Sequence, residues 1–257
     1  MTSVDLNCDL GESFGAYTIG NDEEVLKVIS SANVACGFHG GDPVVMHRTI
    51  ELAKANGVGI GAHPGFNDLW GFGRRRIAVQ DTSELEKMLI YQIGAIQGMA
   101  RACGTEVTHC KIHGALNNMA CVDAEIAMAA ARAVRAVAPE LIFVVLPRSE
   151  LETAGEALDL RMAREIFADR AYDDDAMLVQ RGTPGAVIHD PAEAAARMAR
   201  FLREGAVESV SGKRVEVPID TICVHGDTPG AVAMAAEVRR ALTEAGVTIQ
   251  PMAHTLA

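Results

Sequence analysis

Short runs of β-branched and other apolar residues alternate along this chain with longer segments in which apolar residues recur at helical spacing. This alternation is typical of strand–helix units around a parallel sheet. The pattern predicts strands near residues 4–8, 33–36, 58–62, 108–112, 141–146, 160–167 and 221–224. It predicts helices near residues 22–31, 43–56, 83–103, 124–137, 148–157, 191–204 and 231–245.

Residues at the element boundaries support these limits. Asp42-Pro43 and Asp190-Pro191 each combine an N-cap with a first-turn proline, and Gly57 and Gly246 follow predicted helix ends. No linker, repeat or low-complexity tract divides the chain, so we expect one domain of residues 1–257. The count of about seven units favours a closed (β/α) barrel, with an open doubly wound sheet as the alternative.

Polar side chains follow one face of several predicted strands. In the first strand Asp5, Asn7 and Asp9 share one face, whereas the alternate residues are apolar. Strands of ordinary parallel sheets are apolar on both faces, and burial of an unpaired charge costs several kcal/mol. A barrel resolves this conflict, because polar side chains can line its interior and gather at its carboxyl-terminal mouth. At four further strands the same alternation places polar side chains on the face that avoids bulky aliphatic residues. These side chains are Asn33, His39, His63, His109, Lys111, His113, Thr221 and His225.

We therefore predict a polar funnel at the carboxyl ends of the strands. His109 shares the parity of Lys111 but lies deeper, so we expect it to be structural. His47, His189 and His254 lie away from the strand ends and are assigned no chemistry, and the cysteines are expected to fill the core. The predicted rim comprises Asp5, Asn7, Asp9, Glu12, His39, Asp42, His63, Lys111, His113, Asp169, His225 and Asp227.

Long irregular segments are predicted at residues 64–79 and 168–190, in addition to a hairpin at 207–217, and loops of such length often carry function. The first contains Arg74-Arg75-Arg76, whose guanidinium groups could bind a carboxylate or phosphate or form a solvated basic patch. His39 and His63 with an acid could hold zinc or manganese. No His-x-x-x-His motif supports a metal, so the sequence leaves this question open.

Composition excludes several classes of protein. With 23 Lys and Arg against 34 Asp and Glu, the net charge of −11 disfavours nucleic acid and anionic membranes as partners. The six cysteines form no Cys-x-x-Cys pair and the amino terminus lacks a signal-peptide pattern, so we expect a reducing cytoplasm. No phosphate-loop or dinucleotide motif is found.

Six sequence blocks are similar to those of one known family. In the same order they span nearly the whole chain and closely resemble the LamB/YcsF family, whose members form the A subunit of bacterial ATP-dependent 5-oxoprolinase. The resemblance implies a seven-stranded α/β barrel of the glycoside hydrolase/deacetylase type, in agreement with the unit count. The blocks are Asp5-Leu6-Asn7-Cys8-Asp9-Leu10-Gly11-Glu12, Ser31 to Asp42, Gly61-Ala62-His63-Pro64, Tyr91-Gln92-Ile93-Gly94-Ala95, Glu165-Ile166-Phe167-Ala168-Asp169-Arg170 and Val224-His225-Gly226-Asp227.

The resemblance also implies cleavage of the lactam amide of 5-oxo-L-proline to L-glutamate, coupled to hydrolysis of ATP with Mg²⁺ and requiring two partner subunits. An unstrained lactam is a poor electrophile, and phosphate transfer to its oxygen would open the ring carbon to water. Such a site needs a general base, cations for anionic groups and a proton donor.

The candidate residues divide into two groups. Asp9 or Glu12 would activate water, and Lys111 with Arg74 or Arg170 would balance anions. A histidine would donate protons. The expected catalytic residues are Asp9, Glu12, His63, Lys111, His113 and His225. The expected substrate-binding residues are Asn7, His39, Asp42, Arg74, Asp169, Arg170 and Asp227.

The fourth-strand block departs from the family pattern. Lys111-Ile112-His113 lacks the proline of the family's Lys-Pro-His, and Asn117 replaces a tyrosine. These departures leave open a related lactam or amide as substrate. Two further functions stay possible: a metal-dependent carbohydrate or amide deacetylase, which would work without ATP, and a non-catalytic subunit that binds substrate for its partners.

Overall fold

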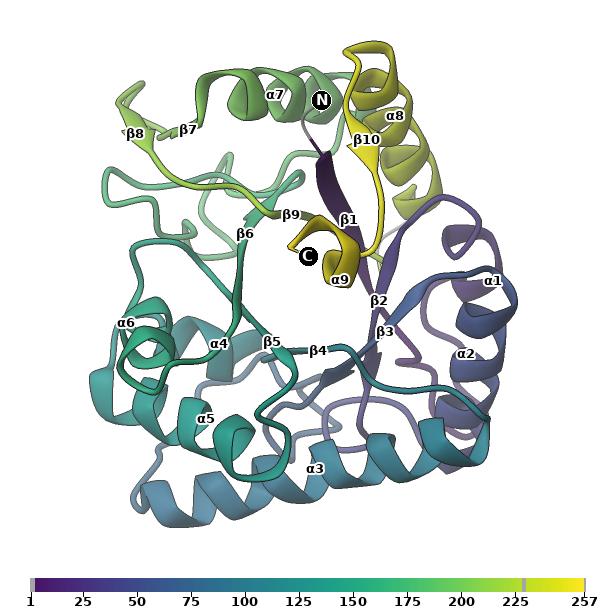
Figure 1. Ribbon diagram of the computed structural model, residues 1–257. Coiled ribbons are helices and arrows are strands. Elements are labelled where there is room, and N and C mark those ends of the chain that lie inside the picture. The colour runs from purple at the N-terminus through teal and green to yellow at the C-terminus, as the bar shows by residue number, and fades with distance from the viewer. Residues whose placement is uncertain (1–2, 228–229, 257) are drawn as a thin grey trace.

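The computed structural model describes residues 3–227 and 230–256. Within these residues seven parallel strands form a closed barrel, because the last strand pairs with both the sixth and the first. The predicted barrel is thus confirmed and the open sheet excluded. Figure 1 shows the strands as a ring with helices around it. The barrel strands are β1 (Ser3–Leu10), β2 (Ser31–Ala35), β3 (Gly59–His63), β4 (His109–Lys111), β5 (Ile142–Val145), β6 (Met162–Phe167) and β9 (Thr221–His225).

Helices cover the outside of the barrel. Most of them begin and end within two residues of the predicted limits. Asp42 and Asp190 cap their helices as expected, each accepting hydrogen bonds from first-turn backbone amides. The predicted hairpin is also present, as β7 (Ala206–Glu208) and β8 (Arg214–Glu216). No helix in the described part of the chain is both long and apolar enough to cross a membrane. The large covering helices are α2 (Pro43–Ala55), α3 (Thr82–Ala102), α5 (Ala124–Val137), α6 (Glu150–Ala157), α7 (Pro191–Glu204) and α8 (Ala231–Glu244).

The helix predicted over residues 22–31 is wrong in its length. Helix α1 (Asp22–Val25) ends early, and the chain enters β2 at Ser31. Both Ser30 and Ser31 donate hydroxyl hydrogen bonds to the buried carboxyl of Asp5, at 2.7 and 2.6 Å. These tertiary contacts with β1 override the local helical pattern.

Three short elements escaped the sequence pattern. Helix α4 (Gly114–Ala120) follows β4 directly, and the strand β10 (Thr248–Ile249) leads into α9 (Met252–Thr255). Figure 1 shows α9 lying across one end of the ring. Met252 packs there against the inward-facing side chains of β5 and β6, including Ile142. The carboxyl-terminal segment therefore closes the amino-terminal end of the barrel, and the opposite end is the mouth.

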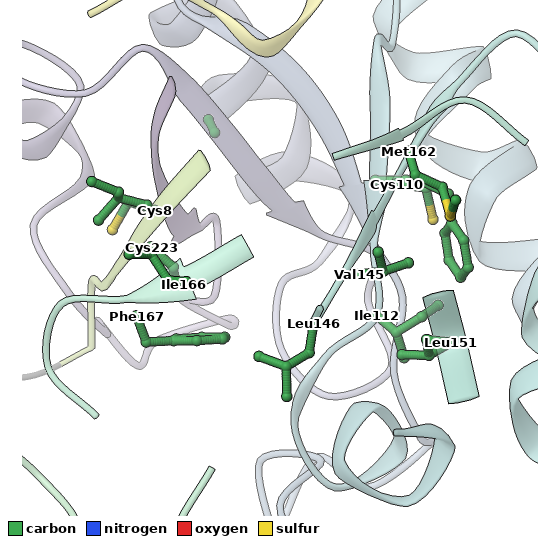
Figure 2. Close-up of a cluster of buried hydrophobic side chains, with 14 of the residues drawn as sticks. Cys8, Cys110, Ile112, Val145, Leu146, Leu151, Met162, Ile166, Phe167 and Cys223 are labelled. Carbon is green, nitrogen blue, oxygen red and sulfur yellow. The ribbon is translucent and has the colours of Figure 1, made fainter. Parts of the chain in front are cut away.

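An apolar layer between barrel and helices forms the main core. Figure 2 shows part of it, where Ile112, Val145 and Leu151 lie together between the strands and α6. All six cysteines are free, and five of them are buried, as expected of small core residues.

Gly61 on β3 makes room for an imidazole inside the barrel. A methyl group at this position would lie 2.1 Å from Nε2 of His109, which is fully buried and donates to Oδ1 of Asn33 at 3.0 Å. We expect Gly61→Ala to lower the free energy of unfolding by about 1–3 kcal/mol through overpacking, measured by urea denaturation. Gly98→Ala on the exposed side of α3, where a methyl group meets no neighbour within 4 Å, is the control and should not destabilise. Equal losses in both variants would contradict this account.

Candidate active site

The polar faces of the strands meet inside the barrel near its mouth. Strand register places Asp9 of β1 beside Asn33 of β2 and His225 of β9. His63 ends β3 and Lys111 ends β4, so both side chains reach the same level. These groups are at most 8% exposed and contact one another rather than water.

Lys111 is the centre of this cluster. Its Nζ lies 3.0 Å from Oδ1 of Asp9, 2.9 Å from Oε1 of Glu165 and 2.9 Å from Sγ of Cys223. It also lies 5.0 Å from the centre of the Phe167 ring, within range of a cation–π interaction. Burial by itself lowers the pKa of Lys111. The charge of Asp9, together with Cys223 and Glu165, outweighs this effect and holds the pKa well above its usual range. The ammonium group is therefore positively charged and committed to internal partners.

Asp9 is held as a carboxylate by its neighbours. Burial raises its pKa, but the interactions with His63 and Lys111 outweigh that effect and keep the pKa well below its usual range. Its Oδ1 also accepts from Nδ2 of Asn33 at 2.8 Å, and its Oδ2 lies 3.4 Å from Nε2 of His63. Glu12 contrasts with Asp9, because burial and the nearby charge of Asp9 raise its pKa well above normal. Two carboxyl groups in one site thus prefer different protonation states.

Three histidines gather beside these acids. The rings of His39 and His113 stack with centroids 3.6 Å apart, and His63 meets His113 edge-on. The residues that follow β3 pack directly against them, since a methyl group at Gly73 would lie 2.7 Å from Cβ of His39. Gln92 of α3 fixes this loop by donating to the carbonyl of Gly65 and accepting from its amide.

A second acid–histidine pair lies at the carboxyl ends of β6 and β9. Nδ1 of His225 is 2.7 Å from Oδ2 of Asp169, and the His225 ring stacks on Phe167 with centroids 5.5 Å apart. Burial raises the pKa of Asp169, but the interaction with His225 outweighs this effect and the pKa is lowered. The pair therefore fixes which His225 nitrogen faces the mouth.

Arginines supply cationic groups at the rim. Of the three in the loop after β3, Arg75 pairs with Asp68 and Arg76 is exposed, whereas Nη1 of Arg74 lies 2.9 Å from Oδ2 of Asp227. Arg181 is half-buried, and its pKa is lowered by burial and by the charge of Arg74. Nearby carboxylates, which include Asp9 and Asp169, raise the pKa of Arg181. Arg181 is therefore close enough to Arg74, Asp9 and Asp169 to interact with their charges.

Glu165 and Arg181 are site residues that the sequence reasoning missed. Strand parity could have found Glu165, because it shares the face of Phe167 on β6 and stands two residues before it. No periodic signal marks Arg181, which lies in the irregular segment between β6 and α7.

Three predicted residues are engaged elsewhere in the protein. Asp5 is wrong as a rim residue, because it is fully buried near the start of β1 and accepts from Thr221 at 2.6 Å. Asp42 accepts from the backbone amides of Val44, Val45 and Gly15. Arg170 donates to the carbonyls of Ala186 and Val179. The substrate-binding roles of Asp42 and Arg170 stay predictions, as do the roles of the other candidates.

These features define a (β/α)₇-barrel protein with a buried acid–base cluster at the carboxyl ends of its strands. The model of the LamB/YcsF family matches residues 4–257, and the chain belongs to this family. It is 54% identical over 254 residues to the A subunit of 5-oxoprolinase from Rhodopseudomonas palustris (strain BisA53), covering 99% of this chain and 100% of that protein.

Solved structures agree with this assignment. The crystal structure of a lactam utilization protein from Thermus thermophilus matches with a TM-score of 0.92 and 46% identity, over 97% of this chain and 99% of that one. A structure described as "T48 deacetylase with substrate" matches with a TM-score of 0.52 and 14% identity, over 99% and 90% of the two chains. The latter similarity concerns the fold alone.

Proposed function

We propose that this chain is the A subunit of an ATP-dependent 5-oxoprolinase, which hydrolyses the lactam amide of 5-oxo-L-proline to L-glutamate. One observation carries the proposal: 54% identity, over the full length, to a relative that bears this name. The mouth of the barrel supplies groups that such a reaction needs, namely an ionised carboxylate, histidines and arginines.

ATP makes the lactam reactive in this scheme. Its terminal phosphoryl group passes to the lactam oxygen, and ADP leaves. Water adds to the ring carbon, the C–N bond breaks, and the ring nitrogen takes a proton. A second water then cleaves the resulting acyl phosphate to glutamate and phosphate. ATP would be used with Mg²⁺, because the metal neutralises charge on the phosphates.

Residues of the mouth divide this work. Asp9 is ionised and takes the proton from the attacking water, with Lys111 holding it in place. His225, oriented by Asp169, donates the proton to the ring nitrogen. Arg74 and Arg181 bind the carboxylate of the substrate, because guanidinium groups suit planar oxyanions.

The partner subunits would cover the mouth of the barrel. Three of the most exposed large apolar side chains follow the first three strands: Tyr17, Val44 and Trp70 are 74, 77 and 96% exposed. Their position at the carboxyl ends of neighbouring strands supports a protein contact there. We place the complex in the cytoplasm, where the six free cysteines stay reduced.

Reconstitution tests this function. The chain is mixed with the two partner subunits, ATP, Mg²⁺ and 5-oxo-L-proline, each is omitted in turn, and glutamate is measured. Glutamate formation that needs every component supports the proposal. Amide or acetyl hydrolysis by the chain alone, without ATP, would instead indicate a deacetylase-like activity. Full turnover after Asp9→Asn would indicate that the chain only binds substrate.

Arg181→Ala is expected to raise the KM for 5-oxo-L-proline about 10- to 100-fold, the worth of one charge-assisted hydrogen bond. The value of kcat should change much less, because the guanidinium binds a part of the substrate that does not react. Arg76→Ala, which removes an exposed arginine of the loop after β3, is the matched control. An unchanged KM in Arg181→Ala would remove this residue from the substrate site.

A further inference from the structure

Two of the buried histidines are fixed in opposite tautomers by the backbone. Nδ1 of His63 lies 2.8 Å from the carbonyl oxygen of Lys111, and Nε2 of His113 lies 2.8 Å from that of Phe72. A carbonyl oxygen only accepts hydrogen bonds, so both of these nitrogens carry a proton. Phe72 adopts a φ of 54°, a conformation that non-glycine residues rarely take, at the point where its carbonyl meets His113.

The two remaining nitrogens face each other. Nε2 of His63 and Nδ1 of His113 are 2.9 Å apart, and in neutral rings each of them carries a lone pair. Two lone pairs at this distance repel unless a cation lies between or beside them. A single proton would satisfy two acceptor atoms, whereas a metal ion recruits three or more.

Further donor atoms converge on the same point. Oε1 of Glu12 lies 3.7 Å from Nδ1 of His113, and Oδ2 of Asp9 lies 3.4 Å from Nε2 of His63. Ligands about 2.0–2.1 Å from a tetrahedral zinc ion are separated by roughly 3.3 Å. This value lies between the 2.9 Å that separates the two imidazole nitrogens and the 3.7 Å from Nδ1 of His113 to Oε1 of Glu12. Metal-binding histidines donate their other ring N–H to a carbonyl or carboxylate, as both of these histidines do. Ligand atoms of Glu12, His39, His63 and His113 all lie within 4.8 Å of one another.

His39 serves this cluster by positioning Glu12. Its Nε2 lies 3.1 Å from Oε1 of Glu12, and its Nδ1 has no hydrogen-bond partner among the residues that the structure describes. If Nε2 bound a metal, the buried Nδ1 would have to carry a proton with no acceptor. Donation from Nε2 to Oε1 of Glu12 avoids that cost and orients this oxygen toward His113.

The geometry points to a divalent transition-metal site at the barrel mouth, in which Nε2 of His63, Nδ1 of His113 and a carboxylate oxygen of Glu12 are the ligands. The mixture of imidazole and carboxylate suits Zn²⁺ or Mn²⁺ and leaves a position open for water or a substrate oxygen. Asp9, 3.4 Å from the His63 nitrogen, stands beside that position. The site rests on these contacts and not on the proposed lactam chemistry.

Metal binding is measured on the isolated full-length chain, without lactam, ATP or partner subunits. After dialysis against a chelator and its removal, the chain is titrated with Zn²⁺ alone and with Mn²⁺ alone by calorimetry. We expect one ion per chain for at least one of the two metals, together with a rise in the temperature of unfolding. Co²⁺ gives a visible absorption spectrum that reports imidazole ligation at the same site. Because nucleotide and substrate are absent, this result is independent of whether the reconstituted complex forms glutamate.

Variants then assign the ligands. His63→Gln and His113→Gln should each weaken metal affinity by at least about 100-fold, and His39→Gln by about 10- to 100-fold, as for a residue that orients a ligand. His47→Gln is the control, because His47 is an exposed histidine on α2 next to Glu51 and should bind metal as the parent chain does. Circular dichroism shows whether each variant is folded.

Two results would overturn the site. The first is that the unsubstituted parent chain binds neither Zn²⁺ nor Mn²⁺ in stoichiometric amounts. Alternatively, the folded His63→Gln and His113→Gln variants could keep the Co²⁺ spectrum, which would mean that the ion binds adventitiously elsewhere. In the first case the two imidazoles share a proton instead.

Discussion

Replacing Lys111 with methionine is expected to lower the free energy of unfolding by about 3–5 kcal/mol, the usual loss when one partner of a buried ion pair is removed. Asp9 and Glu165 both contact Nζ of Lys111, so the variant leaves two buried carboxyl groups without their shared cation. Turnover by the reconstituted complex should fall at least about 100-fold, because Asp9 would lose both its charge partner and its orientation. Urea denaturation and glutamate release measure the two effects.

A second substitution separates stability from chemistry. Lys111→Met combined with Glu165→Gln removes one of the two carboxylates, while Asp9 keeps Asn33 and His63. This double variant should regain a large part of the lost stability but none of the turnover. If Lys111→Met alone proved as stable as the parent chain, Lys111 could not be holding these charges. If the double variant recovered turnover, Lys111 would have no part in the reaction.

The stability of the protein should also depend on the ionisation of Asp5. Burial raises the pKa of this carboxyl to about 6, against 3.8 for an ordinary aspartate. The pKa of Asp5 is higher in the folded protein than in the unfolded chain, so protonation of Asp5 favours folding. This contribution to the free energy of unfolding is fully present below pH 3.8 and is lost as the pH rises through 6. The shift corresponds to about 3 kcal/mol. We expect the unfolding free energy of the parent chain, relative to Asp5→Asn, to fall by about this amount between pH 4 and pH 7.

The comparison with Asp5→Asn cancels the titration of all other groups. The asparagine cannot ionise, so its pH profile lacks this one contribution. Asp159→Asn replaces an exposed carboxyl and serves as the control, with a profile that should follow the parent chain. A constant difference between the parent chain and Asp5→Asn across this range would show that the pKa of Asp5 is not raised in the folded protein. The hydroxyl groups of Ser30, Ser31 and Thr221 would then hold Asp5 as a carboxylate throughout the range.

Local patterns predicted most of the fold. The strands and the larger helices lie within about two residues of the predicted limits, because apolar periodicity and Asp-Pro caps are properties of neighbouring residues. The prediction failed where distant residues decide, as at Ser30 and Ser31, which bond to Asp5 instead of extending a helix. It also missed the small elements α4 and α9, which are too short to show a period.

The candidate site was predictable in its membership but not in its contacts. Parity placed Asp9, His63 and Lys111 on the inner face, and the structure brings them within hydrogen-bond or ion-pair distance. Strand parity could not rank these residues by their roles, because it carries no information about which groups share a proton or a charge. Arg181 was invisible for a related reason, since irregular segments have no face from which a direction can be read.

The sequence by itself determined a barrel of strand–helix units with a polar interior face, since those features follow from the alternation of residue types along each segment. Only the tertiary structure decided that Lys111 is shared between Asp9 and Glu165, and that His63 and His113 turn their unprotonated nitrogens toward each other. Those contacts join residues up to 102 positions apart in the chain. They depend on strand register, barrel closure and the backbone carbonyls that fix each ring, none of which is a local property.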